Sequence, residues 1–191
     1  MKLIIQAILL TIVFTVLTGL LYPLAVTGIA QVAFHDKANG SLIERDGKVV
    51  GSELLAQQFT GPTYFWPRPS AGSYATVPSG ASNLGPTSGA LQSNILNNAK
   101  AFRDGNKLAA DAPVPADMVF TSGSGLDPHI SPAAARLQIA RVAAERTTDV
   151  ARVTALVEKF IESPQWGVLG EPRVNVLLLN LALDQHNSVA Q

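Results

Sequence analysis

The most distinct feature of the hydrophobic pattern is a long apolar run near the N-terminus. From Leu3 to Phe34 no residue carries a full charge, whereas a helix needs only about 20 apolar residues to span the hydrocarbon core of a bilayer. As a helix this run would be about 48 Å long against a core of about 30 Å, so the excess must tilt or emerge. We therefore expect residues 1–34 to form a transmembrane anchor and stalk, a continuous helix that can bend at Pro23.

The few charges that flank this run predict the orientation of the chain. Lys2 and the terminal amine precede the apolar run, and the first charged residues after it, Asp36 and Lys37, cancel. By the positive-inside rule the N-terminus then faces the cytoplasm. Residues 35–191 are accordingly expected to form an extracytoplasmic domain.

A cleaved signal peptide is the alternative interpretation of the same segment. Gly28-Ile29-Ala30 places small residues where a signal peptidase cuts, which would leave Gln31 as the mature N-terminus. The apolar run is longer than the 7–15 residues typical of a signal peptide, so a retained anchor is favoured.

Beyond residue 34 the pattern predicts one small α+β domain with short strands and about four helices. Periodicity and turn signals mark its elements. The first elements are a hairpin of 42–45 and 48–51 around Asp46-Gly47, an ordered loop between Thr60 and Ala99, and a helix through Leu91, Ile95, Ala99 and Phe102 that ends at Gly105. A short strand from Met118 to Ser122 follows, then a helix that Ser131 caps before Pro132, and a second helix, packed antiparallel to it, that starts at Thr148 or Asp149 and ends at Pro164. The last element is a core helix from Val174 to Asp184, whose β-branched start would also suit a strand.

Composition excludes several classes of function. The chain has 14 Lys+Arg and 14 Asp+Glu, so its charge does not favour nucleic acid as a partner. It contains no cysteine, which excludes disulfides, thiolate catalysis and cysteine-ligated metal. The three histidines, His35, His129 and His186, are far apart in the sequence, and no metal site is expected.

One glycine-rich turn contains the best candidate for chemistry. Its residues are Ser122, Gly123, Ser124, Gly125, Asp127 and His129. A serine beside His129 would suit a membrane-tethered hydrolase, but the G-x-S-x-G and S-x-x-K patterns are absent and no third catalytic partner can be named. The P-loop pattern is also absent. Free N–H groups at the start of the Ser131 helix could instead bind an anion, although most capped helices bind nothing.

A second candidate is the aromatic segment Tyr64-Phe65-Trp66-Pro67-Arg68-Pro69. Aromatic and arginine side chains are favoured at protein interfaces, so Tyr64, Trp66 and Arg68 are a possible partner surface. Packing of the same side chains into the core is an equally weighted interpretation.

Several stretches together resemble one family, the C subunit of the Kdp-type potassium-transporting P-type ATPase. They are Tyr22-Pro23, Ala38-Asn39-Gly40-Ser41-Leu42, Tyr64-Phe65-Trp66-Pro67-Arg68-Pro69-Ser70-Ala71, Ser82-Asn83-Leu84-Gly85-Pro86-Thr87, Ser122-Gly123-Ser124-Gly125-Leu126-Asp127-Pro128-His129-Ile130-Ser131-Pro132 and Gly170-Glu171-Pro172-Arg173-Val174-Asn175-Val176-Leu177. The blocks run from end to end of the chain, and the departures are small, such as Ala81 where the family commonly has glycine.

The resemblance implies a non-catalytic subunit in the bacterial inner membrane, within a complex that imports potassium at the expense of ATP. Its implied partners are a P-type subunit that hydrolyses ATP, a channel-like subunit that carries the ion, and membrane lipid. No tightly bound cofactor is implied, but the family's C subunit has been proposed to raise the ATP affinity of the ATP-hydrolysing subunit. Within such a complex the anchor would also be a partner surface, where Gly19, Ala25 and Gly28 permit close helix contact.

Overall fold

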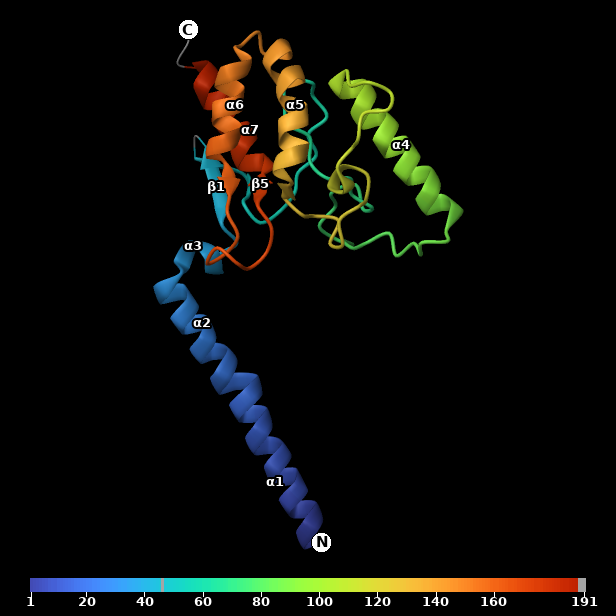
Figure 1. Cartoon of the computed structure of the whole chain (residues 1–191). Coiled ribbons are helices and arrows are strands. Elements are labelled where there is room, and N and C mark those ends of the chain that lie inside the picture. The colour runs from blue at the N-terminus through green and yellow to red at the C-terminus, as the bar shows by residue number, and fades with distance from the viewer. Residues whose placement is uncertain (46, 189–191) are drawn as a thin grey trace. The chain divides into compact units, whose positions relative to one another are not determined.

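The computed structural model describes residues 1–45 and 47–188. The chain divides into two compact units, Met1–Ser52 and Glu53–Gln191 (Figure 1). The first contains the apolar helix and a hairpin, and the second contains a small sheet with its helices. The predicted α+β class, with an N-terminal apolar helix ahead of short strands and several helices, is confirmed.

The apolar segment is one helical run. It consists of α1 (Lys2–Val16), a π-helical turn η1 (Leu17–Leu21) and α2 (Tyr22–Ala33). It is long and apolar enough to cross a bilayer, and among the described residues of α1, η1 and α2 none is buried. An unburied apolar surface of this length is unfavourable in water and suits a lipid environment.

The π-helical turn lies directly before Pro23 and has a physical cause. Proline has no N–H to donate to the carbonyl four residues earlier, and its ring clashes with that carbonyl. The wider turn relieves the clash, and the Tyr22 N–H bonds instead to the Leu17 oxygen, five residues back. The threonine hydroxyl of Thr18 donates to the Phe14 oxygen at 2.6 Å, so it needs no partner outside the helix.

The predicted hairpin is present in the first unit. After the short helix α3 (His35–Ala38), β1 (Leu42–Arg45) pairs antiparallel with β2 (Lys48–Ser52). Gly47 has a φ of 71°, as the expected turn requires, while Asp46 lies outside the described residues. The register shifts between Ile43 and Glu44, so a bulge bends the strand.

The second unit contains four longer helices: α4 (Gly89–Asn106), α5 (Pro132–Glu145), α6 (Val150–Lys159) and α7 (Val176–Ser188). The predicted cap at Ser131 is confirmed, since its side chain accepts a hydrogen bond from the Ala134 N–H. The second helix begins at the expected position, where the Asp149 side chain accepts a hydrogen bond from the Ala151 N–H. α5 and α6 lie side by side as the predicted antiparallel pair (Figure 1). α6 ends at Lys159, before the expected stop at Pro164.

A three-stranded antiparallel sheet lies beside these helices, in the order β3 (His129–Ile130), β5 (Arg173–Asn175) and β4 (Ile161–Glu162). Val174 pairs with both Ile130 and Ile161. The β-branched start of the last element is therefore a strand and its remainder is a helix, so both interpretations of residues 174–184 hold in part.

The core lies where the sheet meets α5, α6 and α7. Its largest fully buried apolar side chains come from one loop, two strands and three helices. They are Phe65, Ile130, Val142, Val153, Val157, Val174, Val176 and Leu179.

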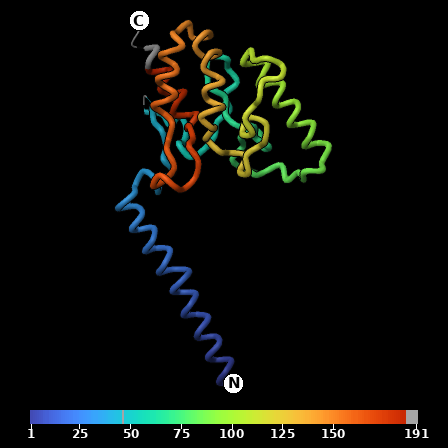
Figure 2. Tube along the Cα trace, in the orientation of Figure 1, coloured from blue at the N-terminus to red at the C-terminus, as the bar shows by residue number. Residues whose placement is uncertain are grey.

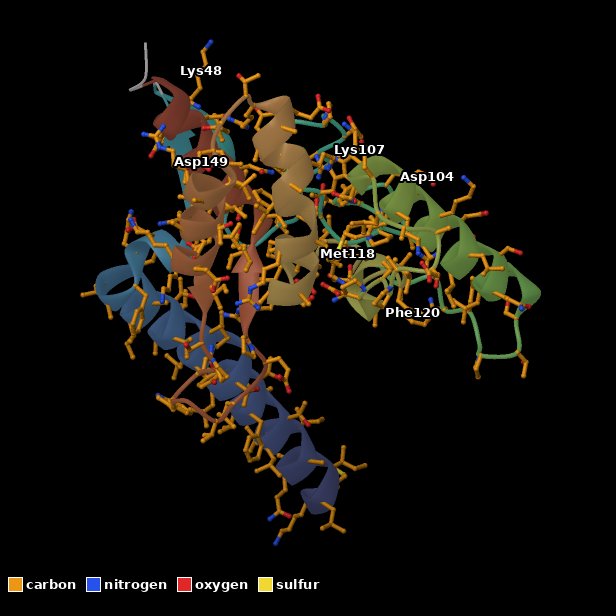
Figure 3. The ribbon with its side chains drawn as sticks, turned by 45° about the horizontal axis from the view of Figure 1, so that its top comes forward. Lys48, Asp104, Lys107, Met118, Phe120 and Asp149 are labelled. Atoms are coloured by element: carbon orange, nitrogen blue, oxygen red, sulfur yellow. The ribbon has the colours of Figure 1, made fainter. Side chains whose placement is uncertain are left out.

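Two expectations about local structure are wrong. The segment from Met118 to Ser122 is not a strand: residues Ala116–Met118 form a 3-10 turn, η2, and the chain then continues as loop. Gly105 does not end α4, which continues to Asn106 and is capped by Lys107 in the left-handed conformation (Figure 3). Both regions are set by packing, since the Met118 side chain is buried in the core and Gly105 lies against the Trp66 ring.

Candidate functional site

One backbone hydrogen bond joins the glycine-rich turn to the loop at Pro69, and a second closes the turn itself. The Ser122 N–H donates to the Pro69 oxygen at 3.2 Å, and the Gly125 N–H donates to the Ser122 oxygen at 3.2 Å. Ser122 itself is buried, and the Ser124 hydroxyl accepts a hydrogen bond from the Leu126 N–H at 3.1 Å. Both serines therefore contribute to the shape of the turn.

Gly125 is needed at its position for two reasons. Its φ of +71° lies in the left-handed region, which favours glycine. A Cβ at this position would come within 2.9 Å of the Gly80 carbonyl oxygen, so the two loops approach too closely for any side chain. The Ser70 hydroxyl fixes the contact by donating to the Gly125 oxygen at 2.7 Å.

Asp127 joins the turn to the aromatic segment. One carboxylate oxygen lies 2.7 Å from Arg68 Nη1, and the other accepts a hydrogen bond from the His129 N–H at 3.0 Å and lies 3.4 Å from His129 Nδ1. Burial alone would raise the pKa of Asp127, but the hydrogen bonds from His129 and Arg68 outweigh it and lower that pKa to about 2. The carboxylate is therefore charged at neutral pH.

The contacts of His129 and of the two serines in this cluster are separate. Within the described residues, no hydrogen bond links the His129 ring to the hydroxyl of Ser122 or Ser124. A catalytic serine needs such a bond to a base. Nor do the described residues contain a group of three or more His, Asp or Glu that could hold a metal ion. The geometry favours an ion pair that fixes a loop.

The start of α5 is arranged as a cap. The Ser131 hydroxyl accepts from the Ala134 N–H at 3.1 Å, and Asp117 accepts from both the Ser131 N–H at 2.6 Å and the Ser131 hydroxyl at 3.1 Å. A carboxylate at a helix N-terminus is stabilising, but it repels any further anion there. This arrangement favours a structural role for the N–H groups that were candidates for anion binding.

Two side-chain amides, one from α7 and one from α5, hold the backbone of the aromatic segment, and we call this set of contacts the clamp. Phe65 is fully buried, and its N–H and carbonyl both bond to the Asn180 amide, at 2.8 and 3.0 Å. The backbone of Trp66 is held in the same way by Gln138, at 2.8 and 3.3 Å. An irregular loop in a core needs such partners for its backbone groups.

Arg141 is the centre of this clamp. Its buried guanidinium lies 4.0 Å from the Trp66 ring centroid, and it donates to Asn106 at 2.9 Å, Gln138 at 2.8 Å and the Tyr64 carbonyl at 2.9 Å, as well as to the Pro62 carbonyl. Burial lowers the pKa of Arg141 to about 10, so it remains charged at neutral pH.

A second arginine holds Tyr64. Arg146 lies over the Tyr64 ring at 4.8 Å and pairs with Asp184 at 2.8 Å, while the Tyr64 hydroxyl donates to the same carboxylate at 3.2 Å. Tyr64, Trp66 and Arg68 thus each interact within the unit. Packing accounts for their contacts in the chain, and a role toward a partner stays a prediction.

Two cavities adjoin these residues. One of about 550 Å³ lies along α4 and is lined by Trp66, Pro67, Tyr74 and Phe102 among others. The other, of about 350 Å³, lies between α6 and α7 and is lined by apolar side chains with Arg146, Arg152 and Lys159. Neither cavity includes the turn at Ser122 to His129.

Comparison with known proteins decides the family. The family model described as "KdpC: K+-transporting ATPase, c chain" matches residues 4–185. The chain belongs to this KdpC family. The match begins inside α1 and includes both compact units. The predicted resemblance is confirmed.

Individual members of the KdpC family are similar over nearly the full chain. A potassium-transporting ATPase KdpC subunit of Rhodospirillum rubrum is 56% identical over 186 residues, covering 96% of each chain. One of Methylococcus capsulatus is 53% identical over 181 residues, covering 93% of this chain and 95% of the relative. One of Mycobacterium bovis is 50% identical over 181 residues, covering 94% and 96%.

Sequence reasoning missed the polar residues that hold the aromatic segment in this KdpC chain. Asn180 was a detectable signal, because an amide within a mostly apolar helix must find a partner when it is buried. Gln138 and Arg141 are three residues apart on α5 and so share a face. Their burial is not evident from the sequence, because charged and amide side chains at such positions are usually solvated.

Proposed function

We propose that the chain is a non-catalytic accessory subunit of an ATP-driven potassium importer. It would bind an ATP-hydrolysing P-type subunit and a potassium-channel-like subunit. The observation that carries this proposal is the KdpC family match over residues 4–185, which includes the membrane helix as well as the folded unit. The contacts of Asp127 with Arg68 and His129 are those of an ion pair that holds a loop, which fits such a role.

The folded unit is suited to present a fixed surface. Arg141 and Asn180 tie the loop around Phe65 to two helices, and the Arg68–Asp127 pair ties the same loop to the glycine-rich turn. The buried Arg141 guanidinium, each nitrogen of which donates a hydrogen bond, restricts the loop to one arrangement. A subunit that supports assembly needs such a surface.

We place the N-terminus in the cytoplasm and the folded unit outside, in the bacterial inner membrane, because the positive charge of Lys2 and the amine precedes the helix. The unit would then be separated from cytoplasmic ATP by the bilayer. External assembly, or gating near the potassium entrance, therefore ranks above direct nucleotide contact as the way it supports transport.

Orientation is testable because the chain has no cysteine. A single cysteine at Lys100, whose side chain is 75% exposed, should react in intact cells with a maleimide that cannot cross membranes. Labelling only after the cells are lysed would contradict the proposed orientation. A cysteine inserted between Met1 and Lys2, which keeps the Lys2 charge in place, serves as the opposite control, since it should react only after lysis.

Co-purification tests the function. Mild-detergent purification of the tagged full chain should recover two larger membrane subunits, one of which forms a covalent phosphoenzyme with ATP. Recovery of the chain alone would refute the accessory role. The intact mass of the same sample should begin at Met1. A chain that starts at Gln31 would instead indicate a signal-cleaved protein.

The small residues of the helix test how the partners bind. Ala25 and Gly28 are three residues apart and share a face, whereas Gly19 lies about two and a half turns from Gly28. A Cβ at Gly28 would meet no atom within 4 Å in this chain, so leucine there causes no internal clash. Replacing all three residues, by Gly19→Leu, Ala25→Leu and Gly28→Leu, should weaken co-purification with insertion unchanged, and Gly19→Leu alone measures the share of its face of the helix. Equal recovery in all variants would reduce the helix to an anchor.

A further inference from the structure

The loop between β4 and β5 places an apolar group at its tip. Trp166, Val168 and Leu169 are exposed to 88%, 78% and 52%, and we call them the loop-tip group. In Figure 2 this loop projects from the end of the strand pair. A tryptophan exposed to this extent is unfavourable in water, because it presents a large apolar ring without cover.

The backbone of the loop forms its own hydrogen bonds. The Gln165 N–H and the Leu169 N–H each bond to the other residue's oxygen at 2.9 Å, and the Gly167 and Val168 N–H groups bond within the loop at 3.0 and 3.2 Å. Trp166 and Gly167 have positive φ angles of 53° and 78°, which makes the turn tight. Backbone groups paired in this way can leave water at low cost.

The loop tip is uncharged, and the charged residues that flank it are Glu162, Glu171 and Arg173. From Ser163 to Gly170 no residue carries a full charge. At the base of the loop, Glu162 and Arg173 neutralise each other in an ion pair of 2.9 Å. A tip of this kind has no charge with which to select an anionic surface, and it suits the region between zwitterionic headgroups and acyl chains, where tryptophan is enriched.

The loop leads directly into β5, the strand that contacts the first residue of the second unit. That unit begins at Glu53, whose carbonyl accepts a hydrogen bond from Asn175 Nδ2 at 2.8 Å. Asn175 ends β5, the strand that directly follows the loop. The membrane helix is connected through residues 34–52 to this point, so the second unit is tethered to the membrane that the helix spans.

We infer that the loop-tip group inserts into the lipid interface of the membrane that the N-terminal helix spans. The loop is thus a second membrane contact of the chain. It would limit rotation of the folded unit about its connection to the helix. The inference does not depend on which side of the membrane the unit occupies, nor on the proposed partners.

Tryptophan fluorescence tests this contact directly, because the chain has only two tryptophans, and Trp66 is held in the clamp at Arg141. The full chain is reconstituted into phosphatidylcholine vesicles with or without brominated acyl chains. Subtracting the spectrum of Trp166→Phe gives the emission of Trp166. We expect this emission to be shifted to the blue relative to exposed tryptophan and to be quenched by brominated lipid, with the remaining Trp66 emission little quenched.

A second variant keeps the probe and removes its apolar neighbours. Val168→Asp with Leu169→Asp should abolish the blue shift and the quenching of Trp166, and far-ultraviolet circular dichroism should show that the fold is retained. Trp166 emission that is unquenched in vesicles of the full chain would overturn the inference. Shielding of Trp166 that develops only when the partner subunits are reconstituted would overturn it too, because the loop would then be a protein contact.

Discussion

Replacing Gly105 by alanine would separate helix propensity from packing in one substitution. Gly105 lies inside α4, where alanine is favoured over glycine by about 1 kcal/mol. A Cβ at this position, however, would lie 2.3 Å from Trp66 Cη2 and 2.6 Å from Trp66 Cζ3. Atoms cannot approach so closely, so either α4 or the indole ring must shift.

The indole cannot shift freely. Its Nε1 donates to the Gly61 carbonyl at 3.0 Å, and its face lies 4.0 Å from the Arg141 guanidinium. Overpacking of this kind costs about 1–3 kcal/mol, and a disturbed cation–π contact adds about 1 kcal/mol. After the gain in helix propensity is subtracted, we expect Gly105→Ala to lower the free energy of unfolding by about 2 kcal/mol.

Urea and thermal unfolding of the full chain in mild detergent, followed by tryptophan fluorescence, would measure the effect. A loss of about 2 kcal/mol corresponds to a fall in Tm of roughly 4–8 °C for a unit of this size. Gly89→Ala is the matched control, because it lies in the same helix and its Cβ would meet no atom within 4 Å. If Gly105→Ala raised the stability as propensity alone predicts, the packing argument would be refuted.

Three further substitutions test the buried network and the cap. Asp127→Asn should lower the free energy of unfolding at pH 7, because the pKa of Asp127 in the folded chain, about 2, lies below its ordinary value of about 3.9. In urea titrations this loss of stability relative to wild type should shrink as the pH falls from about 4 to 2. A loss that does not change with pH would contradict the prediction. Arg141→Ala should lower the free energy of unfolding by about 3–5 kcal/mol, because its buried partners lose their donor. As the control, Arg136→Ala removes the exposed pair with Glu158 and should hardly change the urea midpoint. Equal losses of stability in the two variants would argue against the clamp. Ser131→Ala should cost about 1 kcal/mol by thermal unfolding through loss of the cap, and no change would mean that Asp117 alone satisfies the helix start.

Elements defined by local signals were predicted correctly. The apolar run from residue 3, the Asp46-Gly47 hairpin and the helix start at Ser131 each depend on residues that are neighbours in the sequence. A turn or a cap involves interactions over only a few positions, so propensity and spacing suffice to identify it. Family membership could also be predicted, because its motifs are contiguous blocks.

Elements that depend on distant partners could not be predicted. The strand expected at Met118 is a 3-10 turn, because burial of that side chain in the core outweighs local β propensity. Gly105 looked like a helix end, but it is a glycine because Trp66 occupies the space beside it. In both cases the deciding contact comes from another part of the chain.

The candidate site shows the same division. The sequence identified Asp127, His129 and Arg68 as notable, and the order of motifs indicated the family. Only the tertiary structure pairs Arg68 with Asp127 and leaves the His129 ring without a bond to the neighbouring serines within the described residues. The physical reason is that a backbone must fold before charges far apart in sequence can meet, and an ion pair forms only at distances that the fold alone determines.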